Sequence, residues 1–256
     1  RPDKDPSNQS LRRFGLGLKK IASRNGASFI NQFDPYMSIM LRAHSGDTNA
    51  CIGGGDAVHP GPAGHTMMAH IILKALNAPA LVSNAELDVT RLQNRLGIRT
   101  VQCTVTNAGF TNGVLSFDRL DACLPMPIDA RAIPALKLAP ILENLNKYEL
   151  RVTGLTADRY DVAMDGETVA TLTRKELADG WNMAVTPGPV RRQARDVLTL
   201  IYKKGEVGGT LWSAQIRPKR AAQVPGLEAQ VADLEEQIAA AWRPKPLHFD
   251  IKPVVQ

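Results

Sequence analysis

An acid and an imidazole lie three residues apart in the glycine-rich segment 53–65, which reads Gly-Gly-Gly-Asp-Ala-Val-His-Pro-Gly-Pro-Ala-Gly-His. A hydrolase with a serine nucleophile needs an imidazole to take the serine proton and return it to the leaving group. It also needs a carboxylate to hold the imidazole in the required tautomer. Asp56 and His59 are of these two types, and Pro60 restricts the backbone directly after the histidine. We therefore take His59 as the candidate general base and Asp56 as its orienting partner.

The block D-x-x-H-P-x-x-x-G-H from Asp56 to His65, followed by Met68-Ala69, resembles the last signature block of SGNH/GDSL-type esterases. In that family the Asp and His of D-x-x-H complete a catalytic triad with a serine from an N-terminal Gly-Asp-Ser block. The resemblance covers about residues 11–80. It implies the C-terminal third of a three-layer α/β/α, flavodoxin-like domain, and hydrolysis of a carboxylic ester, such as an O-acetyl ester of a carbohydrate. The mechanism needs no cofactor and no metal.

The nucleophile of that family has no counterpart in this sequence. Neither a Gly-Asp-Ser block nor the middle blocks that carry the family's oxyanion donors are present. Ser45-Gly46-Asp47-Thr48 contains Gly-Asp, but it offers threonine in place of serine and follows no predicted strand. The chain also begins with Arg1 rather than methionine. We therefore expect the nucleophilic serine to belong to sequence outside this chain, and the 256-residue chain alone to be inactive as an ester hydrolase.

Three other interpretations of this block stay open. Asp56, His59, His65 and His70 could ligate zinc. However, His65 and His70 would lie about 140° apart around a helix, because each residue turns about 100°, whereas paired helical ligands usually lie four residues apart. Asp56 could instead cap a helix by accepting backbone N–H groups. Finally, the chain could be a non-catalytic SGNH-like protein that serves as a carbohydrate- or protein-binding module.

The elements expected around the block form the end of an α/β domain that we assign to residues 1–80. Leu11, Phe14, Leu18 and Ile21 have helical spacing. The expected order is a helix at 11–24, a strand at 27–33, a helix at 34–42, a glycine-rich loop, and a helix at 62–76.

Residues 81–256 have a different character and are predicted to form a β-rich α+β extension. Alternating residues on either side of Asp165-Gly166 predict a β-hairpin. Other strands are expected at 99–106 and 113–120, and helices at 141–147, 173–178, 191–203 and 225–242. The last helix carries only two heptads, so we expect a packed surface helix rather than a coiled coil.

The remaining cysteine, tryptophan and histidine residues form no recognisable site in the sequence. The three cysteines include no C-x-x-C pair; we expect buried thiols, with a Cys103–Cys123 bridge between adjacent strands as the alternative. The tryptophans are expected in the core rather than as a sugar-binding platform, and two histidines are expected as surface or packing residues because no acid is placed to pair with them. These residues are Trp181, Trp212, Trp242, His44 and His248.

Composition excludes several classes of protein. With 44% hydrophobic and 22% charged residues the chain is not wholly disordered. The net charge is +6, but the basic residues are scattered in pairs and the 13 aromatic residues do not interleave with them, so no nucleic-acid partner is expected. No apolar run is long enough for a membrane span. The first ten residues do not resemble a signal peptide; the habit of the family favours a secreted or periplasmic protein, and the sequence does not indicate an oligomeric state.

Overall fold

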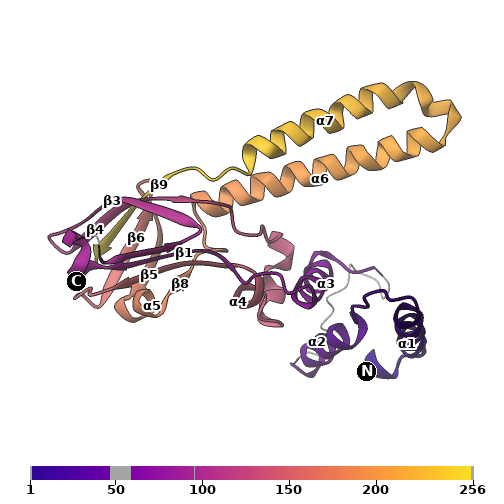
Figure 1. The fold of residues 1–256 in the computed structure, drawn as a ribbon, viewed down its shortest axis with the longest axis horizontal. Coiled ribbons are helices and arrows are strands. Elements are labelled where there is room, and N and C mark those ends of the chain that lie inside the picture. The colour runs from indigo at the N-terminus through magenta and orange to yellow at the C-terminus, as the bar shows by residue number, and fades with distance from the viewer. Residues whose placement is uncertain (1, 47–58, 95, 255–256) are drawn as a thin grey trace. The chain divides into compact units, whose positions relative to one another are not determined.

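The computed structural model describes residues 2–46, 59–94 and 96–254 (Figure 1). The chain divides into two compact units. The first unit comprises Arg1–Ala80 and Ile128–Leu145, and the second comprises Leu81–Pro127 and Asn146–Gln256. The chain therefore leaves the first unit after Ala80 and returns to it once, for 18 residues, before it completes the second.

In the part that the structure describes, the regular elements of the first unit are all helices. The helices expected at 11–24, 34–42 and 62–76 are present as α1, α2 and α3. The full set is η1 (Pro2–Lys4), α1 (Pro6–Arg24), α2 (Phe33–Gly46), α3 (Pro62–Ala75), η3 (Ala130–Lys137) and α4 (Ile141–Leu145). Asp5 caps α1 by accepting the backbone N–H groups of Ser7 and Asn8.

The strand predicted at 27–33 is wrong, because residues 27–32 form no regular element and Phe33 already belongs to α2. The Asn31 side chain accepts a hydrogen bond from the backbone N–H of Asp34 at 3.2 Å. Such a local side-chain bond favours the start of a helix over an extended ladder. A strand also needs a neighbour to pair its backbone groups, and the described part of the first unit offers none.

The core of the first unit is built mainly on α3. Its buried residues are Gly64, Met67, His70 and Ile71, and it packs against α4 and η3. In contrast, α1 has no buried residue. Its apolar positions have the predicted helical spacing, yet Phe14 is 73% exposed, and Leu11, Leu18 and Ile21 are exposed as well.

The second unit contains two β-sheets. The four-stranded sheet has the order β2-β1-β5-β8 and the five-stranded sheet the order β3-β4-β9-β6-β7. The β1–β5 pair is parallel and the remaining pairs are antiparallel. The first sheet comprises β1 (Leu81–Asp88), β2 (Ile98–Val101), β5 (Lys147–Thr153) and β8 (Trp181–Asn182). The second comprises β3 (Cys103–Thr111), β4 (Val114–Asp121), β6 (Arg159–Met164), β7 (Glu167–Thr173) and β9 (Leu247–Pro253).

The hairpin predicted around Asp165-Gly166 is confirmed as β6 and β7. Asp165 has φ of 48° and Gly166 has φ of 80°, and two positive φ values are what a two-residue turn of type I′ requires. The β-rich runs predicted at 99–106 and 113–120 are found in β2, β3 and β4. Four strands were not predicted, namely β1, β5, β8 and β9, and all of them except β8 lie inside their sheets. The helix predicted at 141–147 ends at Leu145, because Lys147 already belongs to β5.

Alternating side chains of the strands form the core of the second unit. Phe117 on β4 and Phe249 on β9 are direct cross-strand partners, and both are buried. Their rings stack with centroids 4.9 Å apart. Residues on either side of them point to the opposite face of the five-stranded sheet. This alternation leaves a polar outer face on β4 and β9.

Two long helices of the second unit form a hairpin (Figure 1). They are α6 (Pro189–Ile216) and α7 (Val224–Ala241), joined by η4 (Pro218–Gln223). The helix predicted at 191–203 is therefore much longer, and the last predicted helix packs against it. Lys204 and Glu235 form an ion pair at 2.6 Å between the two helices. The short helix predicted at 173–178 is α5 (Arg174–Asp179), which begins with a capping box of Thr173 and Glu176.

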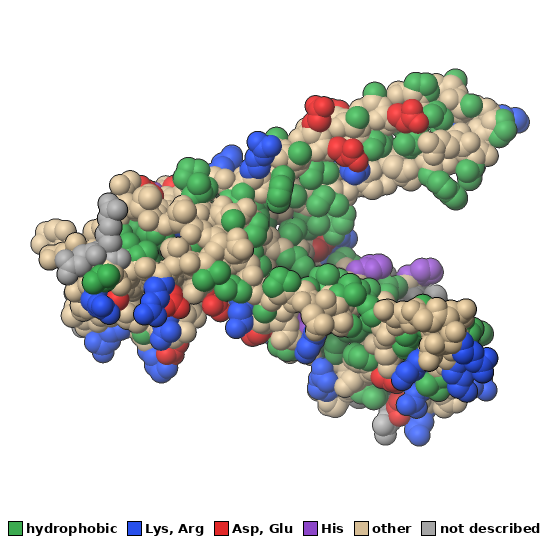
Figure 2. Space-filling view, viewed as in Figure 1, with side chains coloured by type: hydrophobic (Ala, Val, Ile, Leu, Met, Phe, Trp, Pro, Cys, Tyr) green, Lys and Arg blue, Asp and Glu red, His purple; other side chains and the backbone are tan. Residues whose placement is uncertain are grey.

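The charged side chains are spread over the visible face of the molecule among hydrophobic and polar groups (Figure 2). Within the described ranges, no helix has both the length and the apolar character needed to cross a bilayer.

Candidate active site

His59 lies directly before α3, where the chain enters the helix. Gly61 is the N-cap residue of α3 and Pro62 is its first residue. Proline suits that position because its missing N–H has no partner in the first turn. The His59 side chain is exposed, while Pro60 is partly buried and Gly61 is buried. The candidate base is therefore accessible to solvent, and it lies two residues before the buried glycine at which α3 begins.

Asp56 lies in the segment 47–58, outside the described residues, as do Cys51 and the Asp47-Thr48 part of the rejected nucleophile block. The pairing of Asp56 with His59 therefore stays a prediction. Gly61 is the N-cap residue of α3, and the alternative in which Asp56 accepts backbone N–H groups at a helix start also lies outside the described residues.

The two histidines of α3 lie in different surroundings. His65 is exposed, whereas His70 is buried. Asn144 on α4 has its side-chain amide 3.1 Å from His70 Nε2. Burial, helped by the nearby charge of Lys74, lowers the pKa of His70 and favours its neutral form. His70 is a packed core residue, and in the part of the chain that the structure describes no three His, Cys, Asp or Glu side chains are grouped to hold a metal ion.

The predicted alternative of a Cys103–Cys123 disulfide is wrong, because both cysteines are free thiols. The Cys103 thiol lies 3.2 Å from the carbonyl oxygen of Asn84, and the Cys123 thiol lies 3.8 Å from that of Val82. Burial raises the pKa of Cys123 and so keeps it protonated. Both thiols are partly buried and act as small packing groups.

The tryptophans are not all in the core, as the sequence analysis expected. Trp212 on α6 and Trp242 after α7 are exposed, and Trp181 on β8 is partly buried. They lie on three different elements, β8, α6 and the end of α7.

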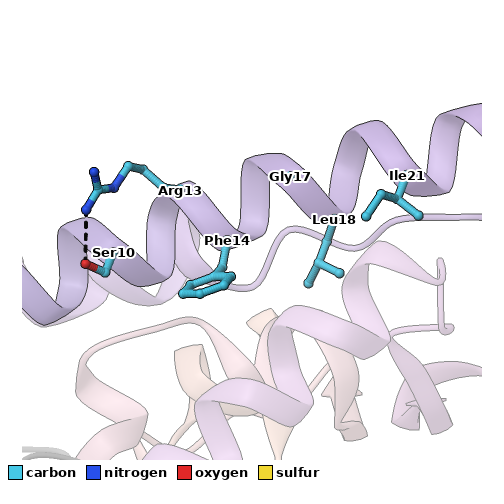
Figure 3. Close-up of a pocket in the computed structure, with 6 residues that line it drawn as sticks. All are labelled: Ser10, Arg13, Phe14, Gly17, Leu18 and Ile21. Atoms are coloured by element: carbon cyan, nitrogen blue, oxygen red, sulfur yellow. Dashed lines mark hydrogen bonds between the residues drawn. The ribbon is translucent and has the colours of Figure 1, made fainter.

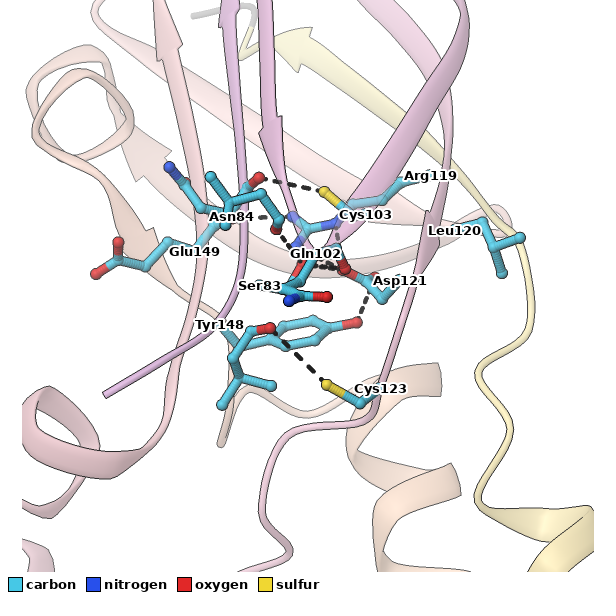
Figure 4. A network of polar contacts seen from close by, with 12 residues as sticks. Ser83, Asn84, Gln102, Cys103, Arg119, Leu120, Asp121, Cys123, Tyr148 and Glu149 are labelled. Carbon is cyan, nitrogen blue, oxygen red and sulfur yellow. Dashed lines mark hydrogen bonds and ion pairs between the residues drawn. The ribbon is translucent and has the colours of Figure 1, made fainter. Parts of the chain in front are cut away.

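A buried polar network links the two sheets of the second unit (Figure 4). Arg119 and Asp121 on β4 form an ion pair at 2.8 Å, and both are buried. Ser83 on β1 and the Tyr148 hydroxyl on β5 both donate to the Asp121 carboxylate. Arg119 also donates to Ser83 Oγ and to the carbonyl of Glu149, each at 2.9 Å.

This network is structural rather than catalytic. The hydrogen-bond partners of Arg119 and Asp121 all belong to the second unit. The Arg119 guanidinium also lies 5.0 Å from the centre of the Tyr148 ring. Burial and the Asp121 charge raise the pKa of Tyr148 far above its usual range, so the phenol stays a hydrogen-bond donor. The network ties β4 to β1 and β5 and fixes the packing of one sheet on the other.

The expectation that His248 lies without an acid partner is wrong. His248 Nδ1 lies 2.6 Å from Asp118 Oδ1, and His248 Nε2 lies 3.5 Å from Asp250 Oδ1. Ser116 Oγ lies 3.0 Å from His248 Nε2. A sequence signal for this cluster exists, because polar and buried apolar residues alternate in Ser116-x-Asp118 and in His248-x-Asp250. This alternation would have predicted two polar strand faces if residues 247–253 had been recognised as a strand.

The comparisons with known proteins establish a fold. No family model matches the chain, and no curated protein matches its sequence. It is similar to a solved structure described as a gut microbial diltiazem-metabolizing enzyme, with a TM-score of 0.81 and 22% sequence identity. The match covers 96% of this chain and 66% of that chain, so this chain spans slightly less than two thirds of its neighbour's length. The predicted mixed α/β class is thus confirmed by two sheets with helices and by a shared fold.

Proposed function

We propose that this chain is part of an SGNH-type ester hydrolase, with His59 as the general base and Asp56 as its orienting carboxylate. The observation that carries the proposal is the D-x-x-H-P block at the entrance to α3, where His59 is exposed. The solved structure with the same fold is described as that of a diltiazem-metabolizing enzyme. We propose ester hydrolysis for this chain mainly on the motif, and the enzymatic neighbour is consistent with it.

The exposed apolar face of α1 supports this assignment. Phe14, Leu18 and Ile21 point to the same side of the helix and line a shallow groove with Ser10 and Arg13 (Figure 3). An amphipathic helix of an α/β/α layer turns such a face toward a sheet. No described residue of the first unit belongs to either β-sheet. We propose that α1 packs against the part of the catalytic domain that carries the nucleophilic serine.

In the proposed reaction His59 takes the proton from the serine hydroxyl as the serine oxygen attacks the ester carbonyl. The protonated imidazole then gives that proton to the departing alcohol. The same steps with water as the nucleophile release the acid. Asp56 stabilises the imidazolium in each step, and general base catalysis of this kind contributes about 10²–10⁴-fold to the rate.

The test uses the parent protein that we propose, in which a Gly-Asp-Ser block accompanies this chain. It should hydrolyse p-nitrophenyl acetate, and His59→Ala should lower kcat/KM by about 10²–10⁴-fold. His65→Ala is the matched control, because His65 is also exposed in the first unit and has no assigned role. Full activity of His59→Ala would refute the assignment. Diltiazem and an acetylated sugar serve as alternative substrates that define the preferred alcohol.

Asp56→Asn separates the catalytic role from a structural one. Asparagine caps backbone N–H groups as well as aspartate does, so a purely structural Asp56 would tolerate the change. Loss of the carboxylate charge should lower kcat without lowering the melting temperature, because the imidazolium loses its stabilising partner. Unchanged kcat would exclude Asp56 as the orienting group.

A further inference from the structure

Four polar side chains meet on the outer face of the five-stranded sheet, far in sequence from His59. Ser116 and Asp118 are alternate residues of β4, and His248 and Asp250 are alternate residues of β9. The strand register places Asp118 opposite His248 and Ser116 opposite Asp250. Because the intervening Phe117 and Phe249 point into the core, these four side chains share the opposite face.

Three of these side chains are linked in the order of a nucleophile, a base and an orienting acid. Ser116 Oγ lies 3.0 Å from His248 Nε2, and His248 Nδ1 lies 2.6 Å from Asp118 Oδ1. Asn107 on β3 donates to the other oxygen of Asp118 at 2.6 Å and so fixes the carboxylate. Hydroxyl, imidazole and carboxylate linked in this order define the triad by geometry, whatever their order in the sequence.

The site is rigid and accessible. Both strands lie inside the sheet, so hydrogen bonds to neighbouring strands hold them on each side. The His248 side chain is 47% exposed, and Ser116 is partly exposed. A small reagent can therefore reach the serine hydroxyl without displacing an element of the fold.

We propose that Ser116 is a nucleophile that His248 activates toward small acyl esters with good leaving groups, such as aryl esters. This proposal departs from the expectation, drawn from the sequence, that the 256-residue chain alone is inactive as an ester hydrolase. Ser116 Oγ forms a bond to the acyl carbon, the bond from that carbon to the aryl oxygen breaks, and His248 Nε2 takes the hydroxyl proton. The imidazolium then protonates the aryloxide. Water, activated by His248 in the same way, releases the acid and restores Ser116.

Asp250 restrains this chemistry. Ser116 Oγ can donate to Asp250 Oδ1 at 2.9 Å instead of to His248. The groups that face His248 are the carboxylates of Asp118 and Asp250, the Lys252 ammonium next to Asp250, and Asp165, which accepts the His248 backbone N–H. The hydrogen bond to Asp118, with the charges of both carboxylates, raises the pKa of His248. The imidazolium cannot accept a proton, so activity should increase as pH rises through the pKa of His248.

The carboxylate of Asp250 lies 2.9 Å from Ser116 Oγ, so it repels negative charge that develops on an ester attacked by this serine and disfavours esters with poor leaving groups. Lys252 Nζ, 3.1 Å from Asp250 Oδ2, offsets part of that charge. These charges explain the restriction to activated esters. They also predict that removing the Asp250 charge increases the reactivity of Ser116.

The test treats the 256-residue chain with a fluorophosphonate, which loses fluoride when a serine oxygen bonds to phosphorus, and with p-nitrophenyl acetate. We expect one adduct by intact mass, located by peptide mapping at Ser116, with a rate that rises with pH. Ser116→Ala should abolish the adduct, and His248→Gln should slow its formation by about 10²-fold. Asp250→Asn should accelerate labelling at pH 7. Ser213→Ala on α6 is the matched serine control and should leave labelling unchanged.

Two results would overturn the proposal. In the first, the fluorophosphonate labels the wild type no faster than it labels Ser116→Ala. In the second, it labels Asp250→Asn more slowly than the wild type, although the circular dichroism spectrum of the variant is unchanged. A merely structural Ser116–His248 contact predicts the second result, because any loss from the cluster would weaken it. His59→Ala should label like the wild type. This variant therefore distinguishes a failure of the Ser116 proposal from a failure of the proposed SGNH function, whose proposed serine lies outside this chain.

Discussion

The two units place their candidate histidines in different ways. His59 of the first unit lies at a loop-to-helix junction, and its proposed partner is three residues away in the sequence. His248 of the second unit lies on a strand, and its partner Asp118 is 130 residues away. The first arrangement is visible in the sequence as a motif, whereas the second exists only through the register of β4 and β9. A short motif therefore reveals sites on loops and overlooks sites assembled by strand pairing.

The units also differ in how their interiors are held. The first unit relies on apolar contacts around α3, and its α1 helix leaves an apolar face exposed. The second unit combines an apolar core with the buried network of Arg119, Asp121, Ser83 and Tyr148. Mutations should therefore have their largest effects on stability in the second unit. In the first unit, truncation of an apolar side chain should cost much more stability at a buried position than at an exposed one.

Arg119→Ala should give the largest loss of stability. It leaves the Asp121 carboxylate buried without its cation, and breaking a buried ion pair typically costs about 3–5 kcal/mol. Urea unfolding of the second unit, followed by circular dichroism, measures this loss. Arg192→Ala is the matched control, since it removes an exposed ion pair with Glu167 and should change stability far less. Equal effects of the two changes would show that the network does not hold the sheets together.

A comparison of Met67→Ala with Phe14→Ala should distinguish the buried core of the first unit from its exposed apolar face. Met67 is fully buried on α3, so its truncation should cost about 2–5 kcal/mol. Phe14 is exposed on α1, so Phe14→Ala should leave the stability of this chain nearly unchanged and should reduce its tendency to aggregate. Thermal unfolding and light scattering measure both effects. If Phe14→Ala destabilised the chain as much as Met67→Ala, α1 would have to be packed in solution.

The smallest expected effect is a pH dependence of the second unit. The folded state raises the pKa of His248, mainly through its hydrogen bond to Asp118. The stabilisation is therefore fully present below the unfolded-state pKa of about 6.5, and it is lost as pH rises through the higher folded-state pKa. The free energy of unfolding of the wild type should fall over that interval, relative to the value for His248→Gln. Parallel pH profiles for the two proteins would show that the contact carries no linked proton.

Much of the secondary structure was predictable because its causes are local. Asp165-Gly166 specifies its turn, Thr173 and Glu176 specify the start of α5, and the spacing of Leu11, Phe14, Leu18 and Ile21 specifies α1. The strand expected at 27–33 failed because apolar residues without a pairing partner do not form a ladder. The strand β9 was missed because its polar residues make it resemble a loop until its neighbours β4 and β6 are in place.

By itself the sequence determined the mixed α/β class, the helices of the first unit, the β6–β7 hairpin and the motif that carries His59, because each depends on residues within one or two turns of the chain. Only the tertiary structure decided that Arg119 is buried against Asp121 and Ser83, that α1 keeps its apolar face exposed, and that His248 lies between Asp118, Asp250 and Ser116. These features depend on strand register and burial, which bring together side chains that are separated by tens of residues and have no local signature.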